Sequence, residues 1–332
     1  MNVELLRRLP KVELHVHLEG SFDAERIAEL ACEAGEEVPY DVESILAPGN
    51  LDDLLTRLDW WCGLVRTPEQ AERQAHDFAA RLWEDGIVYA EVIVNPTHWK
   101  GLPREVLLDA VSAGFARAAG EGLCDAWLLV SLLRSQRGEE ALEVVSSLER
   151  RPPSRLVGLS IDGNEDAAGP TGKRFAAAFG LAGAIGLGRT AHAGESSGPE
   201  GVASALDDLC VSRIDHGVRS IEDPYLVERL VRDAVTLDVC LTSNVRLLYG
   251  SLELHPLRAL VESGVPVTIN TDDPATLGVT LSSEMDLAES ICSWGLAGAV
   301  ACTERAIEAS FASDPTSSAL RRKLKAFVTQ AG

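Results

Sequence analysis

Short, nearly continuous apolar segments alternate along the chain with longer segments in which apolar residues recur at helical spacing. Apolar runs of this kind are typical of strands buried on both faces, and their alternation with helices is typical of a parallel sheet. The runs predict strands at residues 12–18, 88–94, 126–132, 156–161, 189–192, 213–216, 236–241 and 265–270. Eight strand–helix repeats favour a closed (β/α)8 TIM barrel.

Helix-boundary signals support this division of the chain. Apolar residues at helical spacing predict a helix over 51–65, and the TPEQ sequence at 67–70 supplies an N-cap, a proline at N1 and a capping-box glutamine for the next helix. The Asp-Pro pair at 223–224 begins another helix in the same way. Three glycines are expected just after helix ends: Gly35, Gly120 and Gly264.

The connection between the first two strands is unusually long. We expect a single barrel domain over residues 1–332, with a helical insertion at about 41–85 and further C-terminal helices at about 281–330. Long insertions often carry an active-site lid. The simpler alternative is that the helix at 51–65, with Trp60 and Trp61, only packs on the barrel, and both roles are compatible.

Composition narrows the possible partners. The chain has 332 residues, 46% of them hydrophobic, and a formal net charge of -21, which argues against binding nucleic acid or an anionic membrane. The seven cysteines are scattered without a CxxC motif, and neither an N-terminal signal peptide nor a long apolar run is apparent. We therefore expect a cytoplasmic protein with a small-molecule substrate. No sequence feature indicates an oligomeric state.

Four histidines stand at the ends of predicted strands. His15 and His17 lie in KVELHVHLEG, and side chains at positions i and i+2 of a strand share one face, so both imidazoles can reach one ion. His192 ends the fifth strand in RTAHAGE, and His216 ends the sixth in RIDHG. The carboxyl ends of barrel strands meet at one mouth, and nitrogen ligands gathered there are typical of a catalytic zinc site.

Acidic residues accompany these histidines. Glu195 follows His192 by three residues, within reach of a metal-bound substrate. Asp272 and Asp273 follow the eighth strand in NTDDP, and we expect one to bind the metal and the other the substrate. The alternative for this Asp-Asp-Pro sequence is a helix N-cap. Two roles are open for His216: a fourth nitrogen ligand, or a base acting on the metal-bound water.

The other three histidines have weaker contexts. His255 precedes a proline, His76 falls within a predicted helix, and His98 follows the second strand near the same mouth. We interpret all three as structural.

In its motifs, the chain resembles the adenosine deaminase family of zinc aminohydrolases, a branch of the amidohydrolase superfamily. KVELHVHLEG, AHAGE, RIDHG, the SNV after Cys240, and NTDDP match the family's motifs in the same order over nearly the whole chain. The resemblance implies a TIM barrel of the metal-dependent hydrolase type.

The resemblance also implies a role for each site residue. Glu195 is implied as the proton donor to the ring nitrogen beside the attacked carbon, and His216 as the residue that orients and activates the zinc-bound water. Asp273 is implied to contact the imidazole side of the purine, and the backbone N–H of Gly163 its pyrimidine ring. The implied ligands of one zinc ion per subunit are His15, His17, His192 and Asp272.

A single metal is favoured over two. Superfamily members with two metals usually need a carboxylated lysine at the end of strand four, and here that strand reads RLVGLSIDGNE, without lysine. One zinc ion is sufficient for the chemistry, because it lowers the pKa of a bound water to about 7.

Two departures from the family pattern bear on the substrate. Glu19 stands where typical adenosine deaminases have an aspartate that contacts the ribose 5′-hydroxyl, so this end of the pocket is narrower. Glutamate there is seen in adenine deaminase-like and other branches of the family, whereas Gly163 resembles the nucleoside enzymes more than the adenine enzymes. Asp162 replaces the usual alanine, and it either adds a substrate-binding carboxylate at the purine edge or is a solvated turn residue.

Three further departures occur in the motifs, and those at positions 215 and 241 are interpreted as affecting backbone preferences. Ser160 replaces a usual aspartate, Asp215 a usual glycine and Leu241 a usual proline.

The expected activity is hydrolytic removal of the 6-amino group from an adenine-containing purine. Adenosine or 2′-deoxyadenosine is the first expectation, with adenine or a 5′-modified adenosine such as aminodeoxyfutalosine next. One alternative is a mononuclear amidohydrolase that acts on a different cyclic amine, amide or lactone. Another is an inactive binding protein, whose expected mark, the loss of a metal ligand or of Glu195, is absent.

Overall fold

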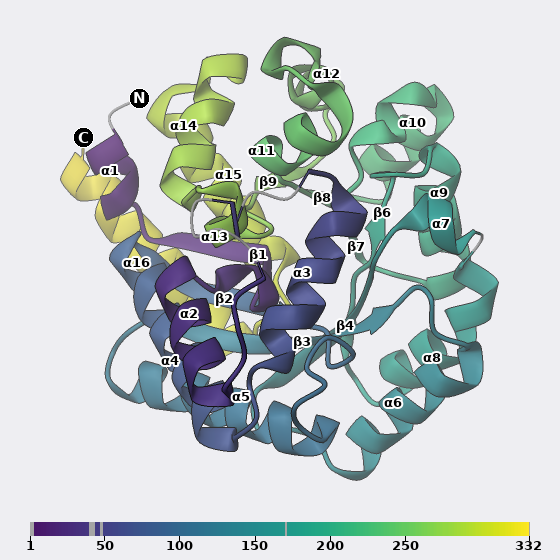
Figure 1. The fold of residues 1–332 in the computed structure, drawn as a ribbon. Coiled ribbons are helices and arrows are strands. Elements are labelled where there is room, and N and C mark those ends of the chain that lie inside the picture. The colour runs from purple at the N-terminus through teal and green to yellow at the C-terminus, as the bar shows by residue number, and fades with distance from the viewer. Residues whose placement is uncertain (1–2, 40–43, 47–48, 170, 332) are drawn as a thin grey trace.

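The computed structural model describes residues 3–39, 44–46, 49–169 and 171–331. The described strands are parallel and follow one another in chain order around the barrel (Figure 1). Their bounds are β1 Lys11–His17, β2 Ile87–Val94, β3 Asp125–Leu133, β4 Leu156–Asp162, β5 Gly188–Arg189, β6 His192–Ala193, β7 Arg213–His216, β8 Thr236–Val239 and β9 Val267–Ile269.

The strands close into a barrel. β1 to β5 form one parallel ladder and β6 to β9 another, and β5 and β6 are two halves of the predicted fifth strand, separated by two residues. Thr190 N–H donates to Leu159 O at 3.0 Å in this gap. The last gap is closed between β9 and β1, where Val16 bridges Asp272 and His17 N–H donates to Asp272 O at 2.8 Å. The predicted (β/α)8 TIM barrel is confirmed.

Helices surround the strands and cover one end of the barrel. The helices that precede β5 are α1 Val3–Arg8, η1 Glu19–Ser21, α2 Ala24–Ala34, α3 Leu51–Gly63, α4 Pro68–Glu84, α5 Arg104–Gly120, α6 Gly138–Arg150, α7 Glu165–Ala168 and α8 Gly172–Ala184. The second half contains α9 Pro199–Ser204, η2 Ala205–Leu209, η3 Val218–Glu222, α10 Pro224–Arg232, α11 Leu241–Asn244, η4 Val245–Tyr249, η5 Leu252–Leu254, α12 Leu257–Glu262, α13 Pro274–Leu277, α14 Leu281–Cys292, α15 Gly295–Ala309 and α16 Asp314–Ala331.

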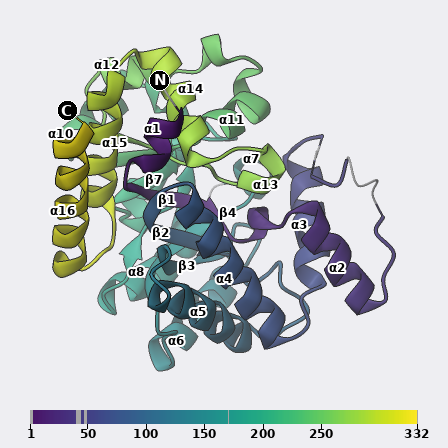
Figure 2. The same cartoon turned by 90° about the vertical axis from the view of Figure 1, so that its left-hand side faces the viewer.

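The long connection after β1 forms α2, α3 and α4. The capping box predicted at 67–70 is present at the start of α4, and Asp223 caps α10 as expected. Figure 2 shows α2 and α3 together at one end of the barrel, whereas α4 lies along its side next to α5. Of the insertion expected at about 41–85, residues 41–43 and 47–48 lie outside the described residues.

One predicted helix end is wrong. Gly35 and Gly264 have the expected positive φ, but Gly120 is the last residue of α5 and the chain reverses two residues later. Gly122, with φ 81°, takes the left-handed position, and Leu123 N–H donates to Ala118 O at 3.0 Å. This bond satisfies a carbonyl at the helix end, which is why the glycine is needed at 122.

Within the described residues, no helix combines the length and apolarity that crossing a bilayer requires.

Candidate active site and metal centre

Four predicted ligands meet at the carboxyl ends of the strands. His15 and His17 come from β1, His192 begins β6, and Asp272 follows β9. All four are buried, and one possible ligand atom from each lies within 4.8 Å of the others. The Nε2 atoms of His17 and His192 are 3.0 Å apart, and Asp272 Oδ1 lies 3.3 Å from His15 Nε2.

The chemistry of this cluster fits a zinc ion. Three imidazole nitrogens and one carboxylate oxygen are the donor types of catalytic zinc sites. His15 Nε2 is buried and has no hydrogen-bond partner among the described residues, which is costly unless a further group binds it. Burial lowers the pKa of His17 to about 4, so its ring is neutral, the form that binds a metal.

Outer partners orient the candidate ligands. His15 Nδ1 lies 3.3 Å from the Asp238 carbonyl oxygen, which leaves its Nε2 to face the cluster. Ser243 Oγ donates to Asp272 Oδ2 at 2.7 Å. Such partners fix ring orientation and raise the basicity of the ligand.

Asp215 supplies an outer contact that the sequence analysis missed. Its Oδ2 lies 3.3 Å from His192 Nδ1 and accepts from Ser160 Oγ at 3.1 Å, and its Oδ1 accepts from Thr190 Oγ1 at 2.7 Å. Asp215 therefore affects more than the backbone preferences assigned to it from the sequence, because its side chain contacts a candidate ligand. The sequence did contain a signal for this contact. Asp215 is a carboxylate directly before His216, and the strand that carries both residues follows the strand that carries His192.

Asp215 and His216 are adjacent, yet both side chains reach the site. Alternation along a regular strand would direct them to opposite faces. His216 has φ 65°, and Asp272 has the same value at the end of the eighth strand. Left-handed conformations are costly for residues with a side chain and tend to cluster at functional sites.

Glu195 and His216 lie beside the four-residue cluster. His216 Nε2 is 3.4 Å from Glu195 Oε1 and 3.9 Å from Asp272 Oδ2. Burial, reinforced by the charge of Asp272, raises the pKa of Glu195 to about 7. A carboxyl group with this pKa can hold a proton near neutral pH and release it to a bound molecule.

A second residue missed from the sequence holds Glu195 in place. The buried carboxylate of Glu165 accepts from Glu195 N–H at 2.9 Å and from Ser197 N–H at 3.2 Å through the same oxygen. The turn that carries Glu195 is thus tied to α7.

A small cavity of about 50 Å³ opens onto the cluster. Leucines from α3 cover it, so this helix contributes to the site as well as packing on the barrel: Leu51, Leu54, Leu55 and Leu58. The predicted substrate-contacting residues all line it: Glu19, Asp162, Gly163 and Asp273. His98, which was expected near the same mouth, lines it too, with its Nδ1 2.7 Å from Asp59 Oδ1 on α3.

Glu19 and Asp273 offer unsatisfied oxygens in this cavity. Glu19 Oε1 accepts from Asn95 N–H at 2.8 Å and from Trp99 Nε1 at 2.6 Å, whereas Glu19 Oε2 and Asp273 Oδ1 are buried without a partner in the described part of the chain. Burial raises the pKa of Glu19 to about 7 and that of Asp273 well above its usual range, the latter also through the charge of Asp272.

Two local features keep these residues in place. A Cβ on Gly20 would lie 1.9 Å from Asp273 Oδ1, so only glycine fits there. Asp162 is buried and its Oδ1 accepts from Asn95 Nδ2 at 2.6 Å, so it belongs to the cavity wall and is not a solvated turn residue.

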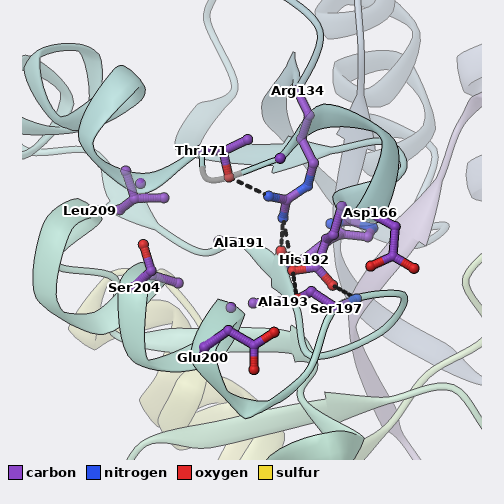
Figure 3. Close-up of a pocket in the computed structure, with 15 residues that line it drawn as sticks. Arg134, Asp166, Thr171, Ala191, His192, Ala193, Ser197, Glu200, Ser204 and Leu209 are labelled. Atoms are coloured by element: carbon purple, nitrogen blue, oxygen red, sulfur yellow. Dashed lines mark hydrogen bonds and ion pairs between the residues drawn. The ribbon is translucent and has the colours of Figure 1, made fainter.

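A larger cavity of about 370 Å³ lies behind His192 (Figure 3). The buried Arg134 guanidinium reaches into it, donating to Thr171 Oγ1 at 2.7 Å and to the His192 carbonyl oxygen. Arg134 therefore fixes the backbone of one cluster residue.

Comparison with known proteins shows the family of this chain. The family model described as adenosine deaminase matches residues 10–327. The chain belongs to the adenosine deaminase family. It is 36% identical over 318 residues to a protein named adenine deaminase from Cupriavidus metallidurans, covering 93% of this chain and 88% of that protein.

Solved structures give the same result. An adenine deaminase from Arthrobacter aurescens is 30% identical with a TM-score of 0.90, covering 97% of this chain and 99% of that chain. An amidohydrolase from Burkhoderia ambifaria with bound zinc is 28% identical with a TM-score of 0.91, covering 99% and 93%. This family member is a metal-dependent aminohydrolase that hydrolytically deaminates adenine-type purines.

Proposed function

We propose that this protein is a zinc-dependent adenine deaminase that converts the free base to its 6-oxo product and ammonia. The free base is favoured over the nucleosides that the motif resemblance put first. The observation that carries this choice is Glu19, whose Oε2 is a buried acceptor without a partner among the described residues.

Glu19 faces the sugar side of the purine if position 19 keeps its family orientation. A free base has an N–H donor at N9, and a nucleoside has none there because the sugar occupies that nitrogen. A free N9–H can therefore satisfy Glu19 Oε2, and leaving a buried acceptor unsatisfied is costly. The small cavity under α3 and the relatives named adenine deaminase support the same choice.

The other cavity residues complete the recognition of the base. Asp273 contacts the imidazole-side nitrogen N7, and burial together with the charge of Asp272 raises its pKa, which favours the protonated form that can donate to this nitrogen. The Gly163 N–H contacts the pyrimidine ring. Asp162, held by Asn95, lines the purine edge.

In the proposed reaction, water adds to C6 and the amino group leaves as ammonia. Zinc held by His15, His17, His192 and Asp272 would supply hydroxide at neutral pH, because it lowers the pKa of bound water to about 7. Glu195 gives its proton to N1, the ring nitrogen beside C6, which makes C6 a better electrophile. His216 faces the attacking water from beside Glu195.

A substrate panel tests the proposal. The zinc-loaded protein is assayed for ammonia release and loss of the adenine absorbance band with adenine, adenosine, 2′-deoxyadenosine and AMP. We expect kcat/KM for adenine to exceed that for any nucleoside or nucleotide by about 100-fold or more. Faster turnover of adenosine or AMP would reject the choice of substrate, and activity on non-purines alone would reject the purine site.

The Glu19→Asp variant provides the matched comparison. It keeps the charge but withdraws the carboxylate by one methylene, so we expect kcat/KM for adenine to fall about tenfold or more. Unchanged preference for adenine in this variant would remove Glu19 from the argument.

A further inference from the structure

A line of buried hydrogen-bonding groups stands behind His216. Asn244 Nδ2, at the end of α11, lies 3.0 Å from His216 Nδ1. Asn244 Oδ1 lies 3.4 Å from His255 Nε2, and the backbone N–H of Leu257 donates to His255 Nδ1 at 3.1 Å. His216 and Asn244 are fully buried and His255 is 5% exposed, so water does not compete for these contacts.

The direction of each hydrogen bond follows from the far end of the line. A backbone N–H can only donate, so His255 Nδ1 must be the unprotonated nitrogen. Burial lowers the pKa of His255 to about 4, so its ring is neutral and carries its one hydrogen on Nε2. The Asn244 atom that faces this Nε2–H must therefore be the carbonyl oxygen.

The same reasoning continues to His216. With its oxygen turned to His255, the Asn244 amide presents its NH2 group to His216 Nδ1. An NH2 group only donates, so His216 Nδ1 accepts and the hydrogen of the neutral ring is on Nε2. The Asp272 carboxylate, whose Oδ2 lies 3.9 Å from Nε2, is an acceptor on that side of the ring.

We propose that Asn244 and His255 are positioning residues that hold neutral His216 as its Nε2–H tautomer. His216 then donates a hydrogen bond to the attacking oxygen and does not act as the base that removes the proton of the water. The donated bond orients this oxygen for attack on C6. The proton lost as the water becomes hydroxide would pass to solvent, solvent would restore the proton that Glu195 gives to N1, and the hydroxyl proton of the adduct would leave with the ammonia. This catalytic consequence rests on the proposed deamination, whereas the tautomer itself does not.

Nitrogen NMR reads the tautomer directly. The zinc-loaded full-length protein is labelled with [15N]histidine and measured without substrate, and the His216 signals are assigned by their loss in His216→Gln. We expect a protonated-type shift for Nε2 and an unprotonated-type shift for Nδ1. A protonated-type shift for Nδ1 and an unprotonated-type shift for Nε2 in the wild-type protein would overturn the proposal. This test needs no substitution in the hydrogen-bonded pair behind His216, which we call the Asn244–His255 relay.

Asn244→Asp tests the relay itself. The carboxylate has nearly the same shape but only accepts, so it should draw the hydrogen of His216 to Nδ1. We expect the two shifts to exchange, kcat for adenine to fall about 100-fold and KM to change by less than about threefold, with zinc content unchanged. The matched control is Asn50→Asp, which adds the same charge at the exposed N-cap of α3 and should leave both readouts unchanged.

A second variant acts from one residue further away. His255→Phe removes the donor that orients the Asn244 amide, so both His216 tautomers should become populated and kcat should fall by about tenfold. Wild-type kcat in either folded variant would overturn the role of the relay. A protein with the expected His216 spectrum but no activity on adenine would instead refute the proposed function and leave the tautomer assignment standing.

Discussion

Replacing Asp215 with asparagine should weaken metal binding without a direct change to any metal ligand. Asp215 Oδ2 lies 3.3 Å from His192 Nδ1, and Oδ1 accepts from Thr190 Oγ1 at 2.7 Å. Asparagine can keep the Thr190 bond with its oxygen, which turns its NH2 group toward His192 Nδ1. The His192 hydrogen is then driven to Nε2, the nitrogen that faces the cluster.

The size of the effect follows from the loss of this orienting contact. Removing an outer partner of a metal ligand typically lowers metal affinity about 10- to 100-fold, or about 1.4 to 2.7 kcal/mol. We expect Asp215→Asn to lower zinc affinity by about 100-fold. The substitution removes the carboxylate acceptor of His192 Nδ1, and the NH2 group in its place disfavours the His192 tautomer that can bind zinc through Nε2. The zinc dissociation constant is measured by competition with a chromophoric chelator at fixed pH.

Two comparisons make this measurement decisive. Ser160→Ala removes only the hydrogen bond from Ser160 to Asp215, so its zinc affinity should remain within about threefold of wild type. Thermal unfolding of each variant checks that the barrel is intact. A folded Asp215→Asn protein with wild-type zinc affinity would refute the reasoning, because His192 would then need no orienting carboxylate.

Three further predictions address the cluster and its cavity. His17→Ala should lose tightly bound zinc, measured by elemental analysis, because one nitrogen ligand is removed; full zinc occupancy would exclude His17 as a ligand. Glu195→Gln should retain zinc but lose at least about 100-fold in kcat, since only the proton donor is removed; near-normal turnover would contradict its role. Burial raises the pKa of Glu19 from 4.5 to about 7, so the folded wild type loses stability as pH rises from about 4.5 through 7. Glu19→Gln should match the wild-type unfolding free energy at low pH and exceed it above pH 7 by up to about 3 kcal/mol, as denaturant titrations at both pH values would show; a constant difference would refute the shift.

The sequence by itself determined the barrel and the main members of the site. The alternation of apolar runs with helices was sufficient for the strand order, because each strand of a parallel barrel is buried on both faces. His15 and His17 could be paired from their spacing alone, since the period of a strand fixes which side chains share a face. The AHAGE and NTDDP motifs, in their order along the chain, predicted Glu195, Asp272 and Asp273 as site residues.

Only the tertiary structure decided which groups support these residues. Asp215 came into contact with His192 because the two residues are register partners on neighbouring parallel strands, and the spacing of residues in one strand does not reveal that register. The left-handed backbone at His216 occurs at the next residue, whose side chain also reaches the site. His98 entered the cavity wall because α3, distant in the sequence, folds over the barrel end. His255 contacts Asn244 although 11 positions separate them in the sequence. The direction of that hydrogen bond is set by the backbone N–H of Leu257, which donates to the other ring nitrogen of His255. Local spacing determines faces of strands and helices, whereas hydrogen-bond partners between distant segments depend on the closed barrel that brings them together.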